Sequence, residues 1–266
     1  MTQRGRNKPA MLLWGLLRAQ LRLAARLFAD VRFRAPLLII WVAAFGGALH
    51  DAVTSFYYLA LCGDKVAVGR IYSGLSLGGL LLSPLYGAWL DRKGVFWPLC
   101  LSSLCCGLGC AVRGLARDVH ELYAGVLILG CGAGGLFTLV LTHLSMHSPA
   151  ESRSAIVSGY VFQCTMLRLL GKGLFPLTNW ILLEITGWEP DTLPVYRVHM
   201  MSCPLFCLFG IAWLLFVDGK ILLRMSHDRI IEVEQQQRSQ AMTADEQQEL
   251  KAFNKGGAEG DGDGER

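Results

Sequence analysis

Long apolar runs separated by short polar stretches fill most of the chain between Pro36 and Val217. Each run is close to ~20 residues, the length at which an α-helix crosses the hydrocarbon core of a bilayer. Pro176 is expected to kink or end the fifth run, because proline removes a helix hydrogen bond. The pattern predicts an all-α membrane protein, a bundle of six transmembrane helices. The spans are expected at about residues 36–61, 70–90, 96–115, 123–144, 154–175 and 198–217.

The composition agrees with a membrane-embedded chain. Of its 266 residues, 53% are hydrophobic and 17% are charged, whereas soluble domains carry about 25% charged residues. The charges gather at both ends and in short loops. The chain is therefore divided into a basic segment (1–34), a membrane domain (35–218) and a charged tail with a disordered end (219–266). No nucleic-acid partner is expected, because the basic residues stand where membrane proteins place them.

Small residues inside two spans predict close helix packing. Gly74 and Gly78 are four residues apart in the second span, and the fourth span carries a glycine-rich run at 130–135. Such spacing lets neighbouring backbones approach. The run lacks the strand and the acidic residue of a dinucleotide loop, so no cofactor is expected. The nine cysteines, including Cys105 and Cys106, show no zinc-ligand spacing and are interpreted as packing residues.

The segment at 11–33 has an amphipathic pattern ahead of the first span. Arg18, Arg22 and Arg26 recur every four residues and share one face of a helix. One interpretation is a helix that lies in the membrane interface, attracted to anionic lipid. The other is an organelle presequence, because the segment is rich in arginine and poor in acidic residues.

Lysine and arginine residues set the expected orientation. They are concentrated before the first span, after the even-numbered spans and in the tail, and this bias places both termini in the cytoplasm. An even number of spans agrees with that assignment. The cations assigned to the other side are Lys65, Arg70, Arg113, Arg117 and Arg197.

A short charged hairpin joins the second and third spans. Its residues Gly87, Asp91, Arg92 and Gly94 match the pattern G-x-x-x-D-[RK]-x-G and stand between two spans. The hairpin resembles the loop between helices two and three of major facilitator superfamily transporters. Gly94 can take a left-handed turn, and Asp91 can accept hydrogen bonds within it. In the family this loop is a cytoplasmic latch onto the other half of the transporter.

A second stretch, 149–159, is similar to the family's loop between helices four and five, where Arg153 precedes a run of small residues. The resemblance covers about residues 36–218 and implies the N-terminal six-helix half of a solute transporter. Such transporters hold solute between two halves near the midplane. The chain is then a fragment of a longer product, a half that pairs with a second half or a homodimer, or a membrane protein that binds or regulates a partner without transport.

Two departures bear on the substrate. The arginine that the family often carries in helix four is absent, since the region reads Val126-Leu-Ile-Leu. The glycine–proline motif of drug–proton antiporters is also missing, which disfavours drug export. The stretch 130–172 looks similar to the branch that carries large neutral amino acids, so an amino acid or another small organic anion is the expected solute.

Charged residues inside spans cost about 2.5–3.5 kcal/mol each, so each requires a partner or a purpose. Asp51, next to His50, and Arg168 fall at similar depths in spans one and five. They are predicted to meet or to line one polar pocket, with Asp51 and His50 taking up a proton. Arg168 and Lys172 would hold a solute carboxylate. The alternative is a structural Asp51–Arg168 pair, with Lys172 reaching the membrane surface.

Other candidate chemistry is sparse. His143 and His147 have a spacing that can bind metal on one helix face, but no third ligand is near them in the sequence. No metal site is therefore assigned. No catalytic triad, carboxylate pair or phosphate loop is present, so an enzyme is not expected.

Overall fold

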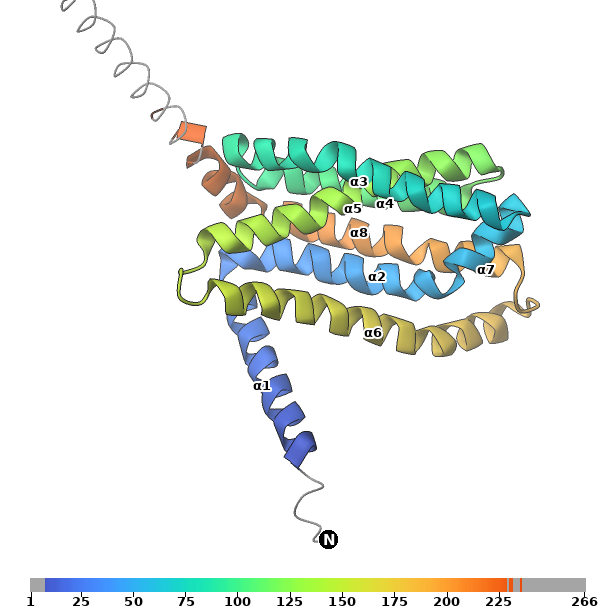
Figure 1. The fold of residues 1–266 in the computed structure, drawn as a ribbon, viewed down its shortest axis with the longest axis horizontal. Helices are drawn as coiled ribbons and strands as arrows, with labels where there is room; N and C mark the ends of the chain where they lie inside the picture. The colour runs from blue at the N-terminus through green and yellow to red at the C-terminus, as the bar shows by residue number, and fades with distance from the viewer. Residues whose placement is uncertain (1–7, 229, 232–234, 236–266) are drawn as a thin grey trace, which may run out of the picture.

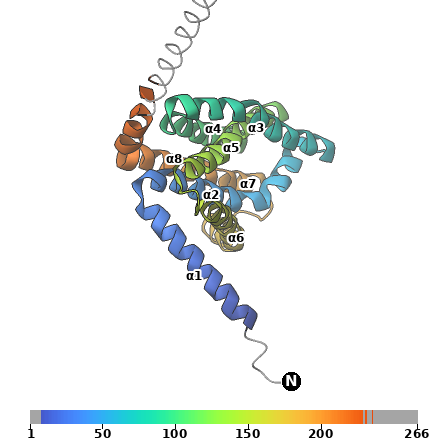
Figure 2. The same ribbon diagram turned by 60° about the vertical axis from the view of Figure 1, so that its left-hand side comes forward.

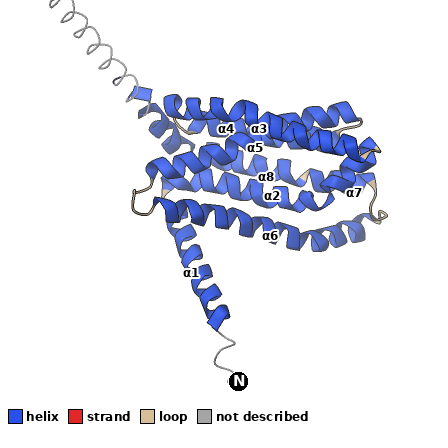
Figure 3. Ribbon diagram, in the orientation of Figure 1, coloured by secondary structure: helices blue, strands red, loops and turns tan. Residues whose placement is uncertain are grey.

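The computed structural model describes residues 8–228, 230, 231 and 235, and every regular element in that part of the chain is helical (Figure 3). Helix continues beyond the last labelled element to Asp228. In chain order the elements are α1 (Lys8–Ala29), α2 (Val31–Cys62), α3 (Lys65–Lys93), α4 (Phe96–Leu115), α5 (Val119–His147), α6 (Arg153–Thr186), α7 (Leu193–Met200), α8 (Ser202–Trp213) and the π-helical turn η2 (Leu214–Asp218).

Helices α2 to α6 and α8 lie side by side in one elongated bundle (Figure 1). Helix α5 packs between α3 and α4, while α2 packs against α6 and α8. One end of the bundle carries α1, the α3–α4 turn, the α5–α6 loop and the helix after η2, and we call it the terminal face. Both ends of the described chain therefore lie at the same end of the bundle.

Five helical segments are long and apolar enough to cross a membrane: α2, α3, α4, α5 and the run Leu193–Asp228. Helix α6 is as long as its neighbours, with 34 residues, but Gln163, Arg168 and Lys172 make it less apolar. It nevertheless lies alongside α2 within the bundle (Figure 1). The all-α prediction and the six-helix bundle are confirmed.

The helix boundaries differ from the predicted ones for identifiable reasons. Helix α4 has the predicted bounds, but α2 begins five residues early, at Val31, where Asp30 caps it by accepting a hydrogen bond from the Arg32 N–H at 3.0 Å. Helix α6 continues past Pro176 to Thr186. Pro176 thus does not end the span, because a transmembrane helix can lose one hydrogen bond and be held by its neighbours. The sixth span is divided into α7 and α8 near Met201.

Glycine contacts hold α5 close to its neighbours, as the small-residue pattern predicted. A Cβ atom at Gly78 of α3 would lie 2.5 Å from the Leu127 carbonyl oxygen of α5. Gly130 of α5 lies against the Leu75 carbonyl of α3 in the same way, and Gly109 of α4 lies against the Leu129 backbone. The glycines therefore permit backbone-to-backbone contact on two faces of α5.

A buried ion pair joins the first and last parts of the membrane domain at the terminal face. Arg34 of α2 donates from Nε to Asp218 at 3.0 Å and also from Nη2. The Asp218 side chain is fully buried and accepts a third hydrogen bond from Trp213 Nε1 at 2.9 Å. This contact fixes the start of α2 to the end of the last span. The proposed tail falls mostly outside the described residues.

Candidate functional site

A cavity of about 650 Å³ opens between the helices of the bundle. Its polar wall comes mainly from α2 and α6, and α3, α4, α5 and α8 supply the rest. Small and apolar residues, such as Ala43, Gly47 and Leu136, line the remainder. The polar and ionisable lining residues are His50, Asp51, Thr54, Tyr58, Tyr72, Arg113, Thr165, Arg168, Lys172 and the cysteines Cys106, Cys110, Cys164, Cys203 and Cys207.

All four intramembrane residues singled out in the sequence line this cavity. His50 and Asp51 come from α2, and Arg168 and Lys172 come from α6. Asp51 has 43% of its side chain exposed, while His50 has only 5%. No ion pair joins Asp51 to Arg168 among the described residues. The two opposite charges thus share one cavity without a direct contact, and both remain open to a solute or an ion.

The shortest polar contact described in the cavity wall involves Arg113, which the charge pattern of the sequence assigned to the outer surface. Arg113 is 3% exposed, and its Nη2 lies 2.6 Å from His50 Nε2. The other ring nitrogen, Nδ1, lies 3.2 Å from the Gly46 carbonyl oxygen, which can only accept. His50 therefore carries its hydrogen on Nδ1, and Nε2 accepts from the guanidinium. This contact requires a neutral imidazole.

The remaining partners of Arg113 are also uncharged. Its Nη1 donates to the Tyr58 hydroxyl at 3.2 Å, and the Cys110 sulfur lies 3.7 Å from Nη2. Its Nε has no hydrogen-bond partner in the structure. A buried cation without a carboxylate contact is costly, so the site has unused capacity for a negative group.

A signal for Arg113 was present in the sequence. Cys106, Cys110 and Arg113 follow one another at spacings of four and three, which places Arg113 on the helix face of the two buried cysteines. Its position near the end of an apolar run led to its count among the surface cations. The correction is that its side chain turns inward, toward α2.

Asp51 extends this arrangement toward the open cavity. Its Oδ1 lies 3.9 Å from His50 Nε2, so Asp51, His50 and Arg113 form a continuous polar series. A carboxylate can take up a proton or accept hydrogen bonds from hydroxyl groups, whereas a guanidinium can donate to oxyanions or hydroxyls. The series therefore combines one acceptor with one strong donor at the cavity wall.

The hairpin motif lies at the terminal face. Gly94 has a φ of 73° and donates its N–H to the Leu90 carbonyl, which closes the turn. Asp91 and Arg92 are exposed. Helix α3 continues through Lys93, and its own backbone bond closes the chain reversal; the expectation that Asp91 accepts hydrogen bonds in the turn stays a prediction. Arg153 is also exposed, at the first turn of α6.

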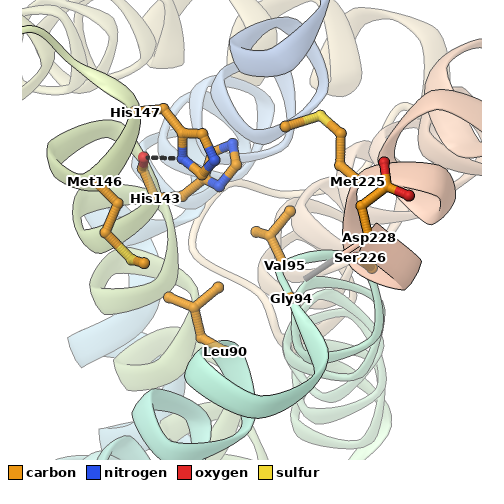
Figure 4. Close-up of a pocket in the computed structure, with 9 residues that line it drawn as sticks. All are labelled: Leu90, Gly94, Val95, His143, Met146, His147, Met225, Ser226 and Asp228. Atoms are coloured by element: carbon orange, nitrogen blue, oxygen red, sulfur yellow. Dashed lines mark hydrogen bonds between the residues drawn. The ribbon is translucent and has the colours of Figure 1, made fainter. Parts of the chain in front are cut away.

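A second cavity, of about 460 Å³, lies beside this turn between α5 and the helix after η2 (Figure 4). Ser226 closes one side: its hydroxyl accepts from the Phe96 N–H at 3.2 Å and lies against Gly94. On the other side, His143 Nε2 lies 3.0 Å from the Arg32 carbonyl oxygen, and His147 Nδ1 lies 3.0 Å from that of His143. The two histidines are thus engaged with the backbone.

Comparisons with known proteins agree with a bundle of membrane-spanning helices. The sugar (and other) transporter family matches residues 32–255. An MFS-type transporter, pydD, of an Acremonium species is 29% identical over 167 residues, 60% of this chain and 28% of the relative. Another MFS-type transporter, gkaD of Penicillium citrinum, is 25% identical over 118 residues, 44% of this chain and 20% of the relative. Myo-inositol transporter 3A of Cryptococcus neoformans is 24% identical over 136 residues, 49% of this chain and 23% of the relative.

The chain belongs to the sugar (and other) transporter family. The family part of the resemblance to major facilitator transporters is confirmed, and with it an integral multi-pass membrane protein. The match to the three relatives covers between 20% and 28% of their lengths. The resemblance to the amino-acid branch finds no support among these relatives.

Proposed function

We propose that this chain is one six-helix half of a transporter that moves a small polar solute by alternating access. The observation that supports the proposal is the cavity of about 650 Å³, whose wall carries charges of both signs inside an apolar bundle. Transporters of this architecture hold their solute between two six-helix units near the midplane. A second unit, in the same polypeptide or in a second copy of this chain, then supplies the facing wall.

The charged residues divide into two roles in this proposal. Asp51 and His50 take up a proton or accept hydrogen bonds from the solute, and Arg168 and Lys172 bind its negative or hydroxyl oxygens. Protonation of His50 would place a second donor against Arg113 Nη2, so proton uptake there would break the 2.6 Å contact. Solute or proton binding is thereby coupled to the side-chain contact between His50 of α2 and Arg113 of α4.

The charge balance of the cavity favours a small organic anion. Three cations, Arg113, Arg168 and Lys172, face one carboxylate, Asp51. None of these residues forms an ion pair with another among the described contacts. A carboxylate on the solute would balance the excess and satisfy the unpartnered Nε of Arg113.

A sugar or polyol is the second candidate. It is favoured by the family and by the relative named a myo-inositol transporter. Hydroxyl groups of such a solute can donate to Asp51 and accept from arginine, and tyrosine rings such as Tyr58 and Tyr72 can pack against its apolar edges.

Binding to the full chain in nanodiscs separates these candidates. The probes are myo-inositol, glucose, succinate and leucine, each measured by calorimetry with wild type, Arg168→Gln and Asp51→Asn. Arg153→Gln is the matched control, since it removes an exposed arginine from the same helix. An anion is indicated if Arg168→Gln weakens succinate binding at least tenfold while Arg153→Gln does not. A polyol is indicated if Asp51→Asn weakens myo-inositol binding.

Light scattering of the same samples, with the lipid contribution subtracted, tests the facing wall. A dimer that binds solute supports pairing of two copies. A monomer that binds none of the probes would favour the alternative function, a membrane protein that binds or regulates a partner without transport. Equal effects of Arg168→Gln and Arg153→Gln on every probe would contradict the assigned cavity roles.

The orientation belongs to the same proposal. The terminal face carries Arg92, Lys93 and Arg153 together with the cations of α1, and this excess supports a cytoplasmic location for both termini. Asp91 and Arg92, exposed at that face, are then available to a second six-helix unit.

A further inference from the structure

Helix α1 differs from the other long helices in direction. It leaves the bundle at the terminal face and runs steeply across the direction of the spans (Figures 1 and 2). When the spans cross a membrane, α1 consequently lies closer to the membrane plane than to the membrane normal.

Only one side of α1 is attached to the bundle. Leu27 is 5% exposed, and the Leu23 side chain lies so close to Gly159 of α6 that a Cβ there would be 2.5 Å from Leu23 Cδ2. Phe28 stacks on Trp41 of α2 with ring centroids 5.8 Å apart. These contacts fix the rotation of α1 about its own axis, and so decide which side faces away.

The free side of α1 has two adjoining faces. Arg18, Arg22 and Arg26 are exposed and recur every four residues, so they occupy a sector of roughly 80°. Trp14 and Leu21 are seven residues apart, which places them on one face beside the arginines, and they are 62% and 61% exposed. An exposed tryptophan and leucine next to a row of cations is the arrangement of a helix at a lipid surface.

The arginines of α1 lack protein counter-charges in the described part of the chain. No aspartate or glutamate occurs from Lys8 to Ala29, and the next acidic residue, Asp30, is bound by Arg32 at 2.7 Å. The hydrogen bond described for the three arginines runs from Arg22 Nε to the Arg18 carbonyl oxygen. Their positive charge is therefore available to an external anionic surface.

From this geometry we propose that α1 docks on anionic lipid headgroups, with its arginines at the phosphate level and Trp14 and Leu21 in the upper acyl region. Headgroup charge complements the arginine row, and the acyl region accepts the apolar face. The proposal is independent of the transported solute, because none of these residues lines the transport cavity.

Hydrogen exchange of the full chain in nanodiscs tests the proposal. The amides of α1 are compared in phosphatidylcholine alone and in phosphatidylcholine with phosphatidylserine. Protection of α1 should rise with phosphatidylserine, by roughly fivefold per arginine at low salt. The variant R18Q/R22Q/R26Q should lose this increase. The matched control, K65Q/R70Q/R117Q, removes three exposed cations from the opposite end of the bundle and should retain it.

Exchange of α5 in the same spectra reports whether each variant is folded. Equal protection of α1 in the two lipid mixtures, or equal loss in both triple variants, would overturn the proposal. Subtracting the fluorescence of Trp14→Phe from that of the wild type isolates the signal of Trp14 and adds a measurement of its depth. Lipids with bromines near their headgroups should quench this signal. Recovery from cells of a chain that begins after Ala29 would also overturn it, since α1 would then be a removed presequence.

Discussion

The contact between α3 and α5 depends on the absence of a side chain at Gly78. An alanine Cβ there would meet three backbone atoms of α5: the Leu127 oxygen at 2.5 Å, the Cys131 nitrogen at 2.8 Å and the Gly130 carbon at 3.1 Å. Real Cβ atoms essentially never approach a heavy atom closer than 3.0 Å, so the helices must separate by at least 3.0 − 2.5 = 0.5 Å. Backbone atoms cannot rotate away as a flexible side chain does.

The size of the effect follows from a comparison within the same helix. Gly69 of α3 has no atom within 4 Å of a Cβ position. Replacing either glycine by alanine improves helix propensity by about 1 kcal/mol, so this gain cancels when the two variants are compared. The remainder is the cost of overpacking, about 1–3 kcal/mol. Gly78→Ala is therefore expected to unfold several degrees below Gly69→Ala, at about 2–4 °C per kcal/mol for a chain of this size.

The assay can use the protein's own thiols. The nine cysteines are free, and five of them, Cys106, Cys110, Cys164, Cys203 and Cys207, are buried. A thiol-reactive dye therefore reports unfolding in detergent as temperature rises, with all variants scanned at one rate. A Gly78→Ala midpoint equal to or above that of Gly69→Ala would refute the close backbone contact between α3 and α5.

Three further predictions concern the terminal face. Asp218→Asn should destabilise the chain by up to about 3 kcal/mol in the same thermal assay, because it leaves Arg34 without its buried carboxylate; no shift would mean that the pair contributes nothing. Gly94→Ala should also lower the midpoint, since φ is 73° and a Cβ would lie 2.7 Å from Ser226 Cα; an unchanged midpoint would show that the helix after η2 is not packed there. Asp30→Ala should cost about 1 kcal/mol at neutral pH as a lost helix cap. The hydrogen bond from Arg32 lowers the pKa of Asp30. The stability difference between Asp30→Ala and wild type should therefore persist to acidic pH and vanish only as pH falls through that lowered pKa, below the ordinary value of about 4. A stability difference that disappears at higher pH would contradict the cap.

The pattern of apolar runs predicted most of the fold correctly. Helix α4 has the predicted bounds, and Gly78 makes the close contact that its spacing indicated. Helix ends were less predictable, because caps such as Asp30 and the continuation of α6 past Pro176 depend on local hydrogen bonds and neighbouring helices. Helix caps and contacts with neighbouring helices leave only a weak signal in a sequence whose main pattern is its long apolar runs.

The candidate site was predicted in part. A charge inside an apolar run is conspicuous, so Asp51 and Arg168 could be singled out, and both line the same cavity. Arg113 was missed because a cation near the end of a run can turn either outward to water or inward to a partner. Its direction is decided by the position of His50 and Tyr58 on α2, to which it donates at 2.6 and 3.2 Å.

The sequence by itself determined that the chain is a bundle of membrane helices with a hairpin of the major facilitator type, because hydrophobic length and short motifs are local properties. Only the tertiary structure decided which charges meet. It brought His50 to Arg113 across 63 positions and Arg34 to Asp218 across 184, while Asp51 and Arg168 share a cavity with no ion pair described between them. The physical reason is that the rotation and packing of each helix, set by glycine contacts and side-chain fit along its whole length, determine where a single side chain points.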